Sequence, residues 1–142
     1  MRITLFAGMA ALVATFAAAQ TTPQTYRGLR VIVTGVEHVD KASLNDCPPG
    51  SNAVNAVARP GDHLAVVAVA FKVLPSFEKT TLKRPVITST DGKTYNTSVQ
   101  FVDVGSTPEF SCQFTFRVPE GTRLKSFAID TLSIDLTPME SK

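Results

Sequence analysis

Two histidines are the side chains in this sequence best suited to hold a metal ion. His38 lies in the segment Glu37-His38-Val39-Asp40, and His63 directly follows Asp62. Imidazole nitrogens with a completing carboxylate are typical of zinc and copper sites. However, the histidines lie at opposite ends of a long connection, with no H-x-H or C-x-x-C spacing, which makes them weak candidates. The interpretation we favour places both at strand ends facing water, with no metal and no cofactor.

The two cysteines, Cys47 and Cys112, allow only one intramolecular pairing. A redox-active pair is disfavoured because the C-x-x-C spacing is missing. In an exported protein, thiols oxidise outside the cytosol, so we predict a structural disulfide between them. Two free thiols remain the alternative.

No catalytic constellation emerges from the residues. Serines and threonines are abundant, but there are only two histidines and no G-x-S-x-G motif. Hydroxyl side chains on alternating segments are typical of the solvent face of a sheet. Because no nucleophile is paired with a base, we predict that the protein is not an enzyme.

The N-terminal segment is typical of a signal peptide. Arg2 is followed by an apolar run from Ile3 to Phe16 and then by the small-residue sequence Ala17-Ala18-Ala19, so we expect cleavage before Gln20. The apolar run falls short of the roughly 20 residues that a spanning helix needs. We therefore predict a signal peptide over 1–19, a single domain over 20–142, and a secreted or periplasmic location with no membrane span after cleavage.

Length and charge narrow the class of partner. The mature chain is long enough for one domain with its own core. The formal charge of +2 falls to near +1 once Arg2 is removed, and this near-neutral value predicts no nucleic-acid partner.

Apolar residues alternate with polar ones along most of the chain, which is the pattern of half-buried strands. The run 64–71 is apolar throughout and predicts a central strand. Asp91-Gly92-Lys93 separates two strand-like runs and predicts a hairpin. The segments that we expect to be strands are 29–36, 64–71, 86–90, 95–101, 110–118 and 127–136.

Two segments are ambiguous. In 127–136 the apolar phase slips by one residue near Asp130-Thr131, which predicts a β-bulge or a strand that changes sheets. Residues 53–58 fit either a short strand or one helical turn. No convincing amphipathic helix is present. Six clear strands and a possible seventh predict an all-β, antiparallel β-sandwich.

The hairpin Asp91-Gly92-Lys93-Thr94-Tyr95 and the strand end Phe116-Arg117-Val118-Pro119-Glu120-Gly121 carry a resemblance. Over roughly 27–136 the chain resembles the immunoglobulin-like extracellular domains of bacterial secreted proteins and lipoproteins. That group includes the mycobacterial immunoprotective secreted antigen and many domains of unknown function. The resemblance implies an immunoglobulin-like β-sandwich and an exported location, with no activity and no catalytic residues. The chain departs from the group in its cysteine pair, its lack of a lipobox cysteine and its Phe77 loop.

Two loops are candidates for binding. The first, 40–59, holds Asp46, Pro48 and Pro49, and long connections inside compact domains are often functional. The second, 75–79, contains Phe77. Loops at one end of a sandwich commonly form a recognition surface. The competing interpretation is that the first loop only crosses between sheets and that Phe77 folds back on the core.

These observations predict an exported, non-catalytic β-sandwich domain that recognises another envelope or extracellular protein. One alternative is a periplasmic protein that binds a small ligand or a metal, which would need a pocket or a meeting of His38 with His63. Another is a protease-inhibitor-like module, which would need a rigid exposed loop at 46–51.

Overall fold

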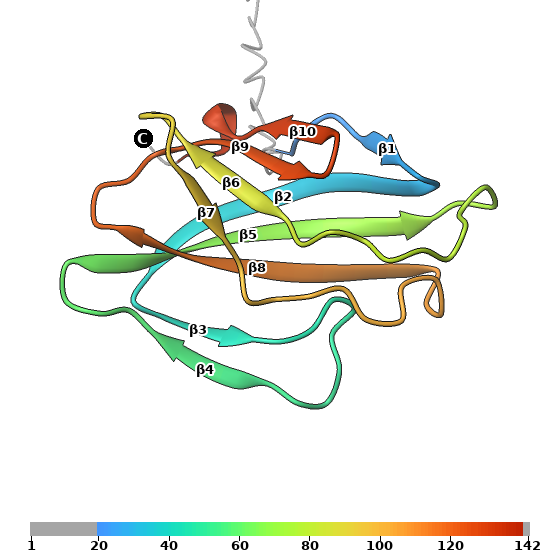
Figure 1. Cartoon of the computed structure of the whole chain (residues 1–142), viewed down its shortest axis with the longest axis horizontal. Coiled ribbons are helices and arrows are strands. Elements are labelled where there is room, and N and C mark those ends of the chain that lie inside the picture. Colours follow the sequence, from blue (N-terminus) through green and yellow to red (C-terminus); the bar gives the residue numbers. More distant parts are fainter. Residues whose placement is uncertain (1–19, 141–142) are drawn as a thin grey trace, which may run out of the picture.

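The computed structural model describes residues 20–140 and shows an all-β sandwich of two four-stranded antiparallel sheets (Figure 1). The predicted signal peptide, 1–19, lies outside the described residues. One sheet has the strand order β1-β2-β5-β8, and the other has the order β10-β9-β6-β7. A separate two-stranded sheet pairs β3 with β4. The strands are β1 (Gln24–Tyr26), β2 (Leu29–Val39), β3 (Lys41–Leu44), β4 (Val54–Val57), β5 (Asp62–Val73), β6 (Val86–Ser89), β7 (Thr94–Asn96), β8 (Glu109–Pro119), β9 (Leu124–Ile129) and β10 (Leu132–Asp135).

The core lies between the two large sheets and is built by the alternation visible in the sequence. On β8, Phe110, Cys112, Phe114 and Phe116 are buried, whereas most of the residues between them are exposed. Side chains at every second position of a strand point to the same face, so this pattern aims the aromatic rings at the opposite sheet. Phe127 of β9 meets Phe114 there with ring centroids 5.6 Å apart.

Strand β5 is the central strand that its continuous apolar run predicts. It pairs with β2 along one edge and with β8 along the other. Its odd-numbered residues from Ala65 to Phe71 belong to the core between the large sheets. Leu64 and Val66 point to the outer face and yet are also buried. They are covered on that face because β3 of the small sheet packs against β5 and β8.

The described chain has ten strands, which corrects the predicted six to seven. The extra strands are short: β1, β3, β4 and β10 have three or four residues each. An alternating pattern needs more residues than that to stand out. Residues 53–58, which the sequence left ambiguous, contain the strand β4.

The phase slip near Asp130 is neither a bulge nor a crossing between sheets. It is a hairpin turn, since β9 and β10 pair with each other and Ile129 lies opposite Leu132. Asp130 has a φ of 51°, a left-handed conformation that aspartate tolerates better than most residues. Its carboxylate accepts a 2.8 Å hydrogen bond from the Tyr26 hydroxyl, which ties β1 to this hairpin. A bulge does occur elsewhere, in β2, where the pairing with β5 slips between Val33 and Gly35.

Helical structure is minimal in the part of the chain that the structure describes. It consists of the three-residue 3₁₀ turn η1 (Thr137–Met139) after β10. Within residues 20–140, no helix is long and apolar enough to cross a membrane.

The segment that carries Phe77 is packed against the turn between β1 and β2. Phe77 is half-buried and contacts the core. Gly28, in that turn, has a φ of 80°, and a Cβ added to it would lie 2.4 Å from the Phe77 backbone. Glycine is required at position 28 both for its backbone conformation and for this close approach.

We expect Gly28→Ala to lower the free energy of unfolding by about 1–3 kcal/mol more than Gly61→Ala does. Both glycines have positive φ, but a Cβ on Gly61 would meet nothing within 4 Å, so the control carries only the shared conformational cost. Urea denaturation of the two variants measures the difference. Equal losses would show that Phe77 does not pack against this turn.

Candidate functional site

A disulfide between Cys47 and Cys112 joins the 40–59 connection to the core, as the cysteine count predicts. The two Cα atoms lie 5.5 Å apart, and both residues are buried. Cys112 is on the inner face of β8, opposite Val69 of β5. The bond therefore fixes the connection to the most buried part of the sandwich.

Backbone hydrogen bonds hold Cys47 on its other side. Its N–H donates to the carbonyl of Gln100 at 2.9 Å, and its carbonyl accepts from the N–H of Val102 at 2.8 Å. Cys47 is thus fixed between β8 and the segment that follows β7. Its covalent and backbone bonds anchor the connection from two directions.

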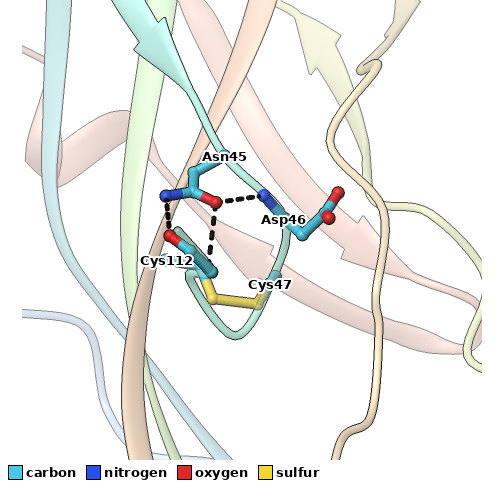
Figure 2. The surroundings of a disulfide bond; sticks show 5 residues. Asn45, Asp46, Cys47 and Cys112 are labelled. Carbon is cyan, nitrogen blue, oxygen red and sulfur yellow. Dashed lines mark hydrogen bonds between the residues drawn. A yellow bond between two sulfur atoms is a disulfide. The ribbon is translucent and has the colours of Figure 1, made fainter. Parts of the chain in front are cut away.

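The side chain of Asn45 shapes the tip of the connection, as Figure 2 shows. Its Oδ1 accepts hydrogen bonds from the N–H of Asp46 at 2.9 Å and of Gly50 at 3.0 Å. Its Nδ2 donates to the Gly50 carbonyl at 3.0 Å. An asparagine that bonds nearby backbone groups in this way stabilises a turn. The tip is therefore held both by a covalent bond and by Asn45.

Two exposed valines lie on the hairpin formed by β3 and β4, which we call the tethered hairpin, one on each face of β4. Val54 and Val57 on β4 are 64% and 55% exposed. Val102, whose N–H bonds Cys47, is also exposed. These three are the exposed large hydrophobic residues of the described range. A groove of about 260 Å³ runs beside Val54 and is lined on the other side by Ser98 and Val99.

Strand β4 presents one edge that no strand in residues 20–140 covers. The N–H of Ala58 donates to the carbonyl of Asp40, so the residues that bond β3 alternate from there along β4. By this alternation the backbone groups of Asn55 and Val57 point away from β3, and the Val57 carbonyl accepts a 3.4 Å hydrogen bond from Nη2 of Arg117. An edge with outward N–H and C=O groups is a template for another extended segment.

Of the predicted loop residues, Asp46 and Pro49 are exposed at the tip, and Pro48 is half-buried beside the disulfide. Phe77 is not an exposed binding residue, because its side chain is half-buried and packs on the core. The sequence did not single out Asn45, Val54 or Val57. For Val54 and Val57, the signal available in the sequence was two valines in a short segment that fits a strand.

His38 and His63 do meet, although they are 25 residues apart in sequence. The Nδ1 atom of His38 lies 2.7 Å from the Nε2 atom of His63, and the rings are perpendicular. His38 lies opposite Ala65 and His63 lies opposite Val118, both of which face the core. The histidines therefore occupy the inner face at one open end of the sandwich, on the adjacent strands β2 and β5.

Glu140, a residue that the sequence analysis did not single out, completes this cluster. Its Oε1 lies 2.8 Å from the Nε2 atom of His38, and its side chain is only 7% exposed. Glu140 follows η1 at the end of the second sheet, so the contact bridges the two layers. No sequence spacing connects a residue near the C-terminus to His38, which is why pattern reasoning missed it.

The surroundings of His63 lower the pKa of its ring. Burial lowers the pKa of His63, and the neighbouring His38 lowers it further, against weaker opposing effects of Glu120, Asp40 and Glu140. Within the described residues no three or more histidine, cysteine, aspartate or glutamate side chains form a ready metal centre. The arrangement is a pair of imidazoles with one carboxylate behind it.

Comparisons with known proteins add little. No protein-family model matches the sequence, and no curated protein matches it. Among solved structures, the chain is similar to an uncharacterized β-sandwich protein from Clostridium difficile 630, with a TM-score of 0.49 and 11% identity, over 82% of this chain and 89% of that one. A likeness of this degree carries no inference about activity, ligand or partner.

Replacing both cysteines, in Cys47→Ala/Cys112→Ala, should lower the free energy of unfolding by about 4 kcal/mol. The disulfide spans 65 residues, and the chain-entropy model gives this value for a loop of that size. Urea denaturation measures the loss, and adding reductant to the double variant should change nothing further. Finding both cysteines of the unreduced protein open to alkylation would contradict the assignment.

Proposed function

We propose that the protein is an exported, non-catalytic recognition module of the cell envelope, and that the tethered hairpin binds an extended segment of another envelope or extracellular protein. The observation that carries the proposal is the uncovered β4 edge with Val54 and Val57 exposed beside it. Backbone groups on such an edge pair with an added strand, and alternate side chains provide specificity.

The anchoring of the hairpin supports this role. Natural sheets usually protect a bare edge with charges, proline or a covering segment. Strand β4 has the sequence Val54-Asn55-Ala56-Val57, with neither a charge nor a proline, and Arg117 bonds the edge only at the Val57 carbonyl. The disulfide and the Asn45 hydrogen bonds fix the tip in advance, so the hairpin itself would lose little conformational entropy on binding.

Export and family membership belong to the same proposal. The signal-like segment 1–19 and the disulfide both fit an oxidising compartment. The resemblance to bacterial immunoglobulin-like extracellular domains is consistent with the β-sandwich. The role we infer for the domain is accessory protein recognition, without a cofactor.

Recognition is tested by a photoreactive amino acid placed at position 55 in the native host. We expect a discrete adduct with one envelope protein, because the outward backbone groups of Asn55 lie where the partner segment would add. Introducing Val54→Lys/Val57→Lys should abolish the adduct, since lysines on an edge oppose strand addition.

The matched control adds the same charge elsewhere, as Thr80→Lys/Thr94→Lys, at two exposed positions outside the hairpin. It should leave the adduct intact. The proposal fails if no discrete adduct forms from position 55, or if both double variants reduce the adduct equally.

Export is tested separately by the mass and N-terminus of the protein recovered from the envelope or medium. We expect it to begin at Gln20, because the small residues at 17 and 19 suit a signal peptidase. Ala17→Leu/Ala19→Leu should leave the precursor uncut. A protein that retains residues 1–19 in the native host would contradict the predicted cleavage.

A further inference from the structure

The contact between His38 and His63 is unusual because two ring nitrogens point directly at each other. A hydrogen bond between them needs one nitrogen to carry a proton and the other to offer a lone pair. The 2.7 Å between Nδ1 of His38 and Nε2 of His63 is therefore tolerated only when a single positive centre lies between the rings. A proton is one such centre, and a metal ion is another.

Glu140 decides which nitrogen of His38 offers the lone pair. An ionised carboxylate only accepts hydrogen bonds, so the Nε2 atom of His38, 2.8 Å from Oε1, must donate its proton to Glu140. In the neutral ring this leaves the lone pair on Nδ1, aimed at His63. A carboxylate behind a histidine in this way fixes the tautomer and raises the basicity of the free nitrogen, as it does for metal-bound histidines.

The burial of Glu140 is a second observation, and it favours a positive charge at this end of the sandwich. Its side chain is 7% exposed, and Oε2 is buried with no hydrogen-bond partner in the structure. A buried carboxylate with half of its oxygens unpaired is costly unless a positive charge lies nearby. The carboxylate of Glu140 thus lies behind the ring of His38, and the other nitrogen of His38 faces the ring of His63.

We propose that His38 and His63 bind one Cu²⁺ ion through Nδ1 and Nε2 respectively, with Glu140 as a positioning residue behind His38. Two nitrogens that each lie about 2.0–2.1 Å from one ion, at right angles to each other, are roughly 3 Å apart. The two rings therefore need to separate by a few tenths of an ångström and to turn until both lone pairs meet at the ion. Cu²⁺ is favoured because imidazole suits it and because it binds most tightly in the Irving–Williams order. Water fills the remaining positions, and this site opens to solvent at the end of the sandwich.

The surroundings suit a cation. The carboxylates of Asp40, Glu120 and Glu140 all act electrostatically on His63 in the direction that favours a positive charge there. The site also lies at the base of the tethered hairpin, since His38 precedes Asp40 and His63 follows the return of the chain into β5. The proposal of a Cu²⁺ site does not depend on the proposed function, because metal binding is measured without a partner protein.

The test is titration of CuCl₂ into the metal-free protein as its host produces it, purified without a polyhistidine tag. Calorimetry should show one ion per chain, and electron paramagnetic resonance should show coupling to two imidazole nitrogens. His63→Gln should weaken binding at least tenfold and leave coupling to one nitrogen. Glu140→Gln should weaken binding 10–100-fold and keep both couplings, because it changes the ligand's basicity and not its identity.

Glu37→Gln is the matched control, since Glu37 neighbours His38 in sequence but is exposed, and it should bind Cu²⁺ like the wild type. Circular dichroism establishes that each variant is folded. The wild-type spectrum is decisive even if a variant fails to fold. Absence of two-nitrogen coupling in the wild type, or unchanged affinity in folded His63→Gln, overturns the proposal.

Discussion

Burial of strand β5 on both faces is the constraint that organises this molecule. One face carries Val67 and its neighbours into the core between the large sheets, and the other carries Leu64 and Val66. Removing a leucine side chain of this kind from water is worth about 1.5–3 kcal/mol, so the outer face cannot be left to solvent. The second large sheet covers the inner face of β5, and the tethered hairpin covers the part of the outer face that carries Leu64 and Val66. The hairpin is thus needed to cover β5, independently of the binding role that we propose for it.

The disulfide makes that arrangement stable. A two-stranded sheet alone is marginal in water, and the tethered hairpin consists of two four-residue strands. Cys47 fixes its tip to the inner face of β8 through Cys112, and the Gln100 carbonyl holds it from the other side. With the tip fixed, the outer strand can keep Val54 and Val57 in solvent without the hairpin collapsing onto the sandwich. The same bond therefore both protects β5 and exposes the β4 edge.

The base of the hairpin brings the two histidines together. The chain leaves β2 just after His38 and re-enters the sheet at β5 just before His63, and the register of β2 against β5 places the two rings in contact. Glu140 then reaches the pair from the other layer. The two proposed sites therefore lie close to each other in the chain. The proposed partner segment would add to β4, and the proposed ion would bind where the hairpin leaves and rejoins the sheet.

Sequence alone determined the features that follow from short-range periodicity and from counting. Alternation along β8, the apolar run of β5 and the turn at Gly92 specify which faces are buried and where the chain reverses. Two cysteines leave one pairing. These inferences hold because side-chain direction in a strand is fixed by its neighbours.

Only the tertiary structure decided the rest, because it depends on which distant segments meet. The phase slip at Asp130 looked like a bulge because a hairpin turn of two residues changes the alternation in the same way. The meeting of His38 with His63 and the approach of Glu140 need the register of β2 against β5 and the packing of the two layers. No local pattern encodes contacts between such widely separated residues. The exposure of β4 likewise depends on what the fold leaves uncovered, which the residues of that strand do not reveal.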